Sequence, residues 1–361
     1  MSAVSVDLAK VQAYLEEVLG GRVSELRAGL IGEGPESIKG YGYGRPLLLQ
    51  FQFAGQPRRL VLETMPAGQF GHEDFSDRAQ IMLWKFHASH KLPQHATSLD
   101  VGAFLTDGRL LSVGPAEEFF LLTEFKEGQG YFHDFDRLAT AAAPAPLDEA
   151  RARALAQYLV RLHSVKHDAP DLYVRRLREL VGHGECLMGL ADSYPAGFQV
   201  PGRLTLAEIE KQAVEWRWRI KPRTYRLCQV HGDFHPWNVL FRAGADFITI
   251  DRSRGEWGEA ADDVTCMTIN YLFFSLQHHG RLAAAYEKLF QLFWDIYLQE
   301  TGDREILEVL QPFYVWRALV VASPVWYPRL APEVRAALFR FIENILATER
   351  FDPARVNDYL D

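Results

Sequence analysis

Cysteine is scarce in this 361-residue sequence, which contains only Cys186, Cys228 and Cys266. The three are far apart and lack the spacing of metal ligands, so we expect reduced thiols, as in a cytoplasmic protein. No apolar stretch reaches the roughly 18 uncharged residues that a membrane span needs. The first residues lack the basic start and apolar centre of a signal peptide. These absences predict a cytoplasmic protein without a membrane span.

Positive charge is in deficit, with 39 lysines and arginines against 47 aspartates and glutamates and a net charge of −8. An acidic chain is a poor partner for nucleic acid and for anionic membranes, so we expect neither. The composition, 48% apolar and 24% charged, is that of a globular protein, and the length suits two lobes. Nothing in the sequence indicates an oligomeric state.

The first third of the chain alternates short apolar runs with glycine and proline, a pattern typical of strands and turns. LLLQFQF (Leu47–Phe53) and RLVLET (Arg59–Thr64) predict adjacent strands joined by the turn AGQP. A helix is expected at Phe75–Ser89, and two more strands at Val101–Leu105 and Phe119–Phe125. An amphipathic helix at the start of the chain precedes them.

From about residue 126 the pattern becomes helical. Apolar residues recur at the i, i+3, i+4, i+7 spacing of one helix face, at Leu155, Tyr158, Leu159 and Leu162. Thr205 followed by Glu208 forms a capping box that predicts a further helix. The expected fold class is α+β, with a small N-terminal β-sheet lobe over residues 1–125 and a larger, mainly helical C-terminal lobe over residues 126–361.

The candidate catalytic side chains lie in one segment, CQVHGDFHPWNVLFRAGADFITID. Its pattern predicts a loop followed by a hairpin. Its strands are VLF (Val239–Phe241) and FITI (Phe247–Ile250). Asn238 comes just before the first strand and Asp251 just after the second, so the hairpin brings them together. Asp233 lies five residues before Asn238 on the connecting loop. One carboxamide and two carboxylates therefore converge.

Hard oxygen ligands of this kind suit Mg²⁺, which keeps several waters and bridges substrate phosphates. Phosphoryl transfer needs a metal clamp, a carboxylate that orients the attacking hydroxyl, and a cradle for the phosphates. Asp233 can serve as the base, while Asn238 and Asp251 can hold the metal.

These residues carry a family resemblance. HGDFHPWN resembles the H-G-D-x-x-x-x-N catalytic loop of aminoglycoside phosphotransferases and their choline, homoserine and fructosamine kinase relatives. The stretch that follows resembles their I-D-x(6)-G-x(4)-D pattern, here Ile250, Asp251, Gly258 and Asp263. The resemblance implies a two-lobed protein-kinase-like fold. It also implies an ATP- and Mg²⁺-dependent enzyme that moves a γ-phosphoryl group to a hydroxyl of a small molecule.

The resemblance also implies roles for single residues. Asp233 would be the catalytic base, and His231 would support the backbone of the loop. Asn238 and Asp251 would coordinate Mg²⁺, and Asp263 would brace the loop. The first lobe would bind the nucleotide and the second the acceptor.

The nucleotide side departs from the family pattern. Relatives hold the donor phosphates with a cation on the third strand, whereas LVLET places Glu63 there. One hypothesis is a swapped ion pair between Glu63 and Arg78. Another is that a cation from elsewhere, such as Lys39, meets the phosphates.

Two other segments are candidates for nucleotide contacts. The glycines of GEG (Gly32–Gly34) and KGYGYG (Lys39–Gly44) permit close approach of backbone to phosphate, although a tight hairpin explains them equally well. In the hinge FLLTEFKEG, the resemblance implies that backbone groups of Glu124, Phe125 and Lys126 bind the edge of adenine.

Alternatives remain open at this stage. Because the third-strand cation is missing, the chain could be an altered relative that transfers a nucleotidyl group or only binds nucleotide, as a pseudokinase does. His231 and His235 bracket the loop aspartate, which would suit a metal-dependent hydrolase. The acceptor is unidentified, and Glu256, Glu259 and Asp262 are candidates for an acidic acceptor-binding cluster.

Overall fold

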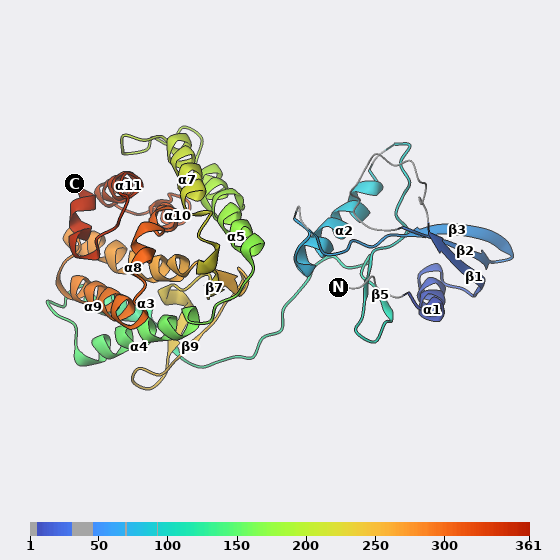
Figure 1. Ribbon diagram of the computed structural model, residues 1–361, viewed down its shortest axis with the longest axis horizontal. Helices are drawn as coiled ribbons and strands as arrows, with labels where there is room; N and C mark the ends of the chain where they lie inside the picture. The colour runs from blue at the N-terminus through green and yellow to red at the C-terminus, as the bar shows by residue number, and fades with distance from the viewer. Residues whose placement is uncertain (1–5, 31–45, 69–70, 92) are drawn as a thin grey trace. The chain divides into compact units, whose positions relative to one another are not determined.

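The computed structural model describes residues 6–30, 46–68, 71–91 and 93–361. The chain forms two compact units, Met1–Thr123 and Glu124–Asp361 (Figure 1). In the part of the chain that the structure describes, no helix is both long and apolar enough to cross a membrane.

The first unit is built on an antiparallel sheet in the order β1-β2-β3. Its strands are β1 (Val23–Leu30), β2 (Leu47–Phe53) and β3 (Gln56–Leu62). The predicted β2 is confirmed, whereas β3 begins earlier than expected. Only Ala54 and Gly55 separate the two strands, and both have positive φ angles (50° and 72°), as a tight hairpin turn requires.

Helix α1 (Leu8–Leu19) covers the sheet and forms the small core of this unit. From Leu49 to Phe53 apolar side chains alternate with polar ones along β2, and the buried ones, Leu49 and Phe51, face the helix core. The buried core residues are Val11, Leu15, Val23, Leu49 and Phe51.

The predicted helix at Phe75–Ser89 is confirmed as α2. Asp77 in its first turn accepts a hydrogen bond from the backbone N–H of Asp74 (2.8 Å), which fixes the start of the helix. A short hairpin, β4 (Gly102–Phe104) and β5 (Leu110–Ser112), follows.

The predicted strand at Phe119–Phe125 is wrong, because these residues form no regular secondary structure and pair with no strand among the described residues. Apolar composition suggested a strand, but a strand forms only where a neighbour takes up its backbone hydrogen bonds. The partner of β4 is instead β5, whose three residues are too short to stand out in the sequence.

The second unit is mainly helical. It also holds a three-stranded antiparallel sheet in the order β6-β8-β9 and the pair β7-β10. The strands are β6 (Gln129–Gly130), β7 (Cys228–Gln229), β8 (Val239–Phe241), β9 (Phe247–Thr249) and β10 (Trp257–Gly258). The helices are α3 (Phe132–Leu138), α4 (Pro146–His163), α5 (Pro170–Gly182), α6 (Leu187–Ser193), α7 (Leu206–Ile220), α8 (Ala260–His279), α9 (Ala284–Thr301), α10 (Gln311–Ala322) and α11 (Pro332–Leu346). Short 3₁₀ turns lie at Thr224–Arg226, Pro236–Asn238, Arg304–Glu308 and Pro353–Leu360.

Helix α8 is the centre of this unit. Every residue from Asp263 to Leu276 is buried, as expected for a helix surrounded on all sides. It packs against α9 and α10, and α4 lies beside α9 (Figure 1). The first turn of α8 reaches the loop between β7 and β8, so this buried helix supports the segment with the predicted catalytic residues.

Candidate active site

The loop between β7 and β8 is held by one buried carboxylate at the start of α8. Asp263 accepts hydrogen bonds from the backbone N–H groups of His231 and Gly232, both at 2.7 Å. Its Oδ2 also lies 3.2 Å from His163 Nε2, at the end of α4. Burial raises the pKa of Asp263, but the hydrogen bond and charge of His163 and the backbone donors outweigh it, so the pKa is lowered. Asp263 thus braces the loop as an anion.

Asp233 follows directly after these two anchored residues. Its Oδ1 lies 2.7 Å from Nη1 of Arg317, and its Oδ2 lies 3.4 Å from Nε2 of His235. Burial raises the pKa of this carboxyl, but His235 and the guanidinium of Arg317 overcome that effect and hold the pKa well below its usual range. Asp233 is therefore ionised throughout the physiological range.

His231 supports the same loop from inside. Its side chain is buried, and Nδ1 accepts a hydrogen bond from the backbone N–H of Asp233 at 3.3 Å. Burial lowers the pKa of His231, so the ring is neutral at pH 7. The geometry is that of a support for the loop rather than of a group that faces solvent.

The hairpin β8–β9 brings the two predicted metal ligands to one end of the sheet. Val239 pairs with Thr249, and the N–H of Ile250 donates to the carbonyl of Asn238 at 3.0 Å. Asp251 comes next, at the same end, with an exposed side chain and a φ of +58°. Aspartate tolerates this left-handed conformation better than most residues, but the conformation is uncommon and typical of functional sites.

The hairpin provides oxygen donors of the kind that Mg²⁺ prefers. The amide nitrogen of Asn238 donates to the carbonyl of Asp233 at 3.0 Å, which leaves the amide oxygen as the atom for a cation. Among the described residues, no group of three or more His, Cys, Asp or Glu side chains could hold a metal by itself. One amide and one exposed carboxylate fit Mg²⁺ that is completed by nucleotide phosphates and water.

On the first unit, the sequence hypothesis of an ion pair between Glu63 and Arg78 is wrong. Glu63, just after β3, forms its ion pair with Lys85 of α2, and both side chains are about half exposed (52% and 51%). Arg78 instead donates from Nη1 to the carbonyls of residues 72, 73 and 74, at the start of its own helix. In the observed pair the anion thus follows the strand, where relatives have a cation, and the cation lies on the helix.

The other residues predicted to contact the nucleotide are Lys39, the glycine-rich segments and the segment Glu124–Lys126. Lys39 and both glycine-rich segments, Gly32–Gly34 and Lys39–Gly44, lie outside the described residues. Glu124 and Lys126 form an exposed ion pair at 2.6 Å, at the start of the second unit, with an exposed Phe125 between them.

Two of the three carboxylates expected to form an acidic acceptor-binding cluster are instead bound by arginines. Glu259 is buried and bound by Arg226 at 2.7 Å, and Asp262 is bound by Arg317 at 2.6 Å. The positive charge of these buried arginines offsets the negative charge that would attract a cationic acceptor. Glu256 accepts from the indole N–H of Trp257 at 2.9 Å.

Sequence reasoning missed Arg317 and Lys85 as partners of site residues. Arg317 is 84 residues from Asp233, on α10, and no local pattern links them. Lys85 lies on α2, and the signal in the sequence that pointed to an altered charge arrangement was the unusual Glu63.

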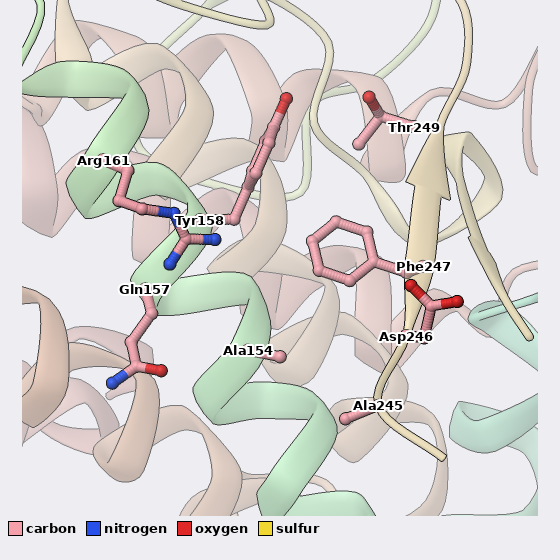
Figure 2. A pocket seen from close by; sticks show the side chains of 8 residues that line it. All are labelled: Ala154, Gln157, Tyr158, Arg161, Ala245, Asp246, Phe247 and Thr249. Carbon is pink, nitrogen blue, oxygen red and sulfur yellow. The ribbon is translucent and has the colours of Figure 1, made fainter. Parts of the chain in front are cut away.

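A surface pocket of about 460 Å³ lies between α4 and the β8–β9 hairpin (Figure 2). Gln157, Tyr158 and Arg161 project from α4, and Asp246, Phe247 and Thr249 come from the hairpin (Figure 2). None of the predicted catalytic or metal-binding residues lines this pocket.

Comparison with known proteins places these features in a family. The sequence profile of the phosphotransferase enzyme family matches residues 87–296, more than half of the chain. The chain therefore belongs to the phosphotransferase enzyme family, and its class is that of a small-molecule phosphotransferase. The family resemblance and the α+β fold class predicted from the sequence, with a sheet-rich first part and a mainly helical second part, are confirmed. A search of curated proteins by sequence found no match.

Solved structures that resemble the chain are distant. An ethanolamine kinase of Plasmodium vivax is 14% identical, with 93% of this chain and 81% of that chain covered and a TM-score of 0.36. The ADP-bound aminoglycoside phosphotransferase APH(2'')-Ib is 13% identical, with 94% and 99% covered and a TM-score of 0.32. A glucosamine kinase in complex with glucosamine, ADP and inorganic phosphate is 16% identical, with 88% and 70% covered and a TM-score of 0.33.

Proposed function

We propose that the chain is an ATP- and Mg²⁺-dependent kinase that transfers the γ-phosphoryl group to a hydroxyl of a small molecule. One observation carries this proposal: Asp263 anchors the backbone of His231 and Gly232. This anchoring presents an ionised Asp233 beside Asn238 at the end of the hairpin. Phosphoryl transfer depends mainly on such positioning and on charge stabilisation, because its transition state is loose.

In this proposal Asp233 is the catalytic base. Its carboxylate accepts a hydrogen bond from the acceptor hydroxyl and aims the oxygen at the γ-phosphorus. A carboxylate with a low pKa is a weak base, which suits a reaction in which the hydroxyl proton leaves late. His231 holds the loop. Asn238 and Asp251 would hold Mg²⁺, which neutralises the phosphates when it is bound with the nucleotide.

On the donor side we propose that Lys85 replaces the missing strand cation. Glu63 holds Lys85 by an ion pair, so the pair has the parts of a lysine–carboxylate clamp with the positions exchanged. Lys39 and Arg78 are the other candidate cations. Main-chain groups of the segment Glu124, Phe125 and Lys126 would bind the adenine edge, as the family resemblance implies.

The first test is a thermal shift of the purified protein with ATP, with and without Mg²⁺. A ligand that binds only the folded state raises the melting temperature by mass action. We expect a shift that needs Mg²⁺ and disappears in Asp251→Ala. Asp246→Ala is the matched control, because Asp246 is an exposed aspartate on the same hairpin. A shift that Asp251→Ala leaves intact would contradict the metal assignment.

The second test measures ADP release with a panel of hydroxyl acceptors that includes choline, ethanolamine, homoserine, fructosamine, glucosamine and aminoglycosides. Release that depends on both the acceptor and Asp233 supports the kinase. MgATP binding without any release that depends on Asp233 would instead favour a relative that only binds nucleotide. Absence of any nucleotide-dependent shift would reject both.

A further inference from the structure

Arg317 of α10 makes three polar contacts beneath the catalytic loop. Nη1 donates to Asp233 Oδ1 at 2.7 Å, and Nη2 donates to the carbonyl of Gly232 at 2.9 Å. Nη2 also donates to Asp262 Oδ1 at 2.6 Å. One guanidinium therefore ties the carboxylate of the proposed base to the backbone of its own loop and to the start of α8.

Arg317 is buried, and a buried charge destabilises the fold unless it is paired. The side chain of Arg317 is 6% exposed, and its Nε has no hydrogen-bond partner among the described residues. Removing a guanidinium from water costs several kcal/mol, which the two carboxylates must offset. Asp233 and Asp262 share this cation, at 2.7 Å and 2.6 Å, so the ion pair that offsets the burial also fixes where the Asp233 carboxylate lies.

The contacts of Asp233 show what Arg317 adds. The backbone N–H of Asp233 donates to His231, and its carbonyl accepts from Asn238, so the main chain is fixed on both sides. Apart from Arg317, the side chain has only weak or long contacts among the described residues, with Cys266 Sγ at Oδ1 (3.9 Å) and with His235 at Oδ2 (3.4 Å). Arg317 binds Oδ1 at 2.7 Å, whereas the contact of Oδ2 within the described part of the chain is the longer one of 3.4 Å with His235. Oδ2 is thus the oxygen that remains for an acceptor.

We infer that Arg317 is a positioning residue that fixes the carboxylate of Asp233 and reserves its Oδ2 for the acceptor hydroxyl. The inference rests on the proposed kinase function. In the step concerned, the hydroxyl oxygen forms a bond to the γ-phosphorus while the bond from that phosphorus to the bridging oxygen of ADP breaks. The hydroxyl proton passes to Oδ2 of Asp233. Arg317 touches neither reactant.

The kinetic test compares Arg317→Met and Arg317→Lys with wild type by ADP release, using the best acceptor of the panel or water as acceptor. We expect Arg317→Met to lower kcat about 10- to 100-fold, because small misplacements of reacting groups have effects of this size. The KM for MgATP should stay unchanged. Arg317→Lys, which keeps the charge and one donor, should recover part of the loss.

A matched control separates positioning from general support of the fold. Arg151 is also buried, and it also binds one carboxylate, Asp134, and one backbone carbonyl, that of Gly244. Arg151→Met should lower the melting temperature as Arg317→Met does, yet leave kcat within about twofold. Equal loss of kcat in both variants would overturn the inference, since Arg317 would then act through stability alone.

A double-mutant cycle on kcat gives the sharpest readout. In an Asp233→Asn background, Arg317→Met should have little further effect, because the carboxylate that it positions is gone. Full additivity of the two substitutions would overturn the inference.

A crystal structure of Arg317→Met beside that of the wild type tests the inference without turnover. We expect the Asp233 carboxylate to rotate or to occupy two orientations in the variant. An unchanged carboxylate would overturn the positioning role. If the wild type releases no more ADP than Asp233→Asn does, the kinase function is rejected instead. The two failures are therefore distinguishable.

Discussion

The two compact units differ in how far their ion pairs are buried. In the helical unit, charged groups at the loop between β7 and β8 are buried and bound, as Asp263 and Arg317 show. In the sheet unit the notable pair, Glu63 with Lys85, is about half exposed on both sides. A buried charge pair fixes geometry, because breaking it leaves an uncompensated charge. An exposed pair contributes little to stability and can exchange its partner for a ligand.

This difference follows from the cores beneath the charges. Helix α8 is buried along its length, so the loop that its first turn holds rests on a rigid support. The sheet unit has a core of few residues, formed by α1 and one face of the sheet. We therefore expect substitutions of the buried charges in the helical unit to change stability and catalysis, and substitutions of the exposed pair in the sheet unit to act mainly on ligand affinity.

The largest expected effect comes from Asp233→Asn. Loss of the base should lower kcat about 10²- to 10⁴-fold, the range for a positioned acid–base group. Circular dichroism should show a folded protein, since the backbone bonds of the loop go to Asp263. ADP release with the best acceptor measures the change, and Asp246→Asn on the same hairpin is the control. Retention of more than about half of the activity would refute the role of Asp233.

Asp263→Asn should have the largest effect on stability. The variant loses an anion that accepts from His231, Gly232 and His163 in a fully buried site, at a cost of about 3 kcal/mol in the free energy of unfolding. The folded pKa of Asp263 is lowered, so its stabilisation is present above the unfolded carboxyl pKa of about 3.9 and is lost as the pH falls through the folded value. Urea denaturation should therefore show a constant difference in the free energy of unfolding between wild type and variant from pH 6 to 8. This difference should narrow below about pH 4. A difference that widened on acidification would contradict the assignment of Asp263 as a stabilising anion.

Lys85→Met tests the exchanged clamp in the sheet unit. If Lys85 meets the donor phosphates, its loss should weaken MgATP binding about tenfold, equivalent to about 1.4 kcal/mol. Lys91→Met is the control, because Lys91 is an exposed lysine just beyond the same helix. Titration calorimetry with MgATP measures both variants. Unchanged affinity in Lys85→Met combined with weaker binding in Arg78→Ala would make Arg78 the donor cation instead.

Local patterns in the sequence predicted the parts of the fold that depend on near neighbours. The alternation in β2, the length of α2 and the hairpin around Asn238 and Asp251 were predictable because each is a short-range arrangement. The contact of Arg317 with Asp233 was not, because it depends on the packing of α10 against α8. The false strand at Phe119–Phe125 has the same origin, since strand pairing is decided by a distant partner.

The smallest expected effect concerns the stability contribution of the exposed pair. A double-mutant cycle with Glu63→Gln and Lys85→Met should give a coupling free energy of about 0.2–1 kcal/mol, as for other exposed ion pairs, and 1 M salt should reduce it. The same cycle on MgATP affinity should give a larger coupling, because Glu63 acts there by aiming Lys85 at the phosphates. Urea denaturation and calorimetry provide the two measurements. A coupling in stability that exceeded the coupling in affinity would mean that this pair braces the fold as the buried pairs do, and the contrast between the two units would fail.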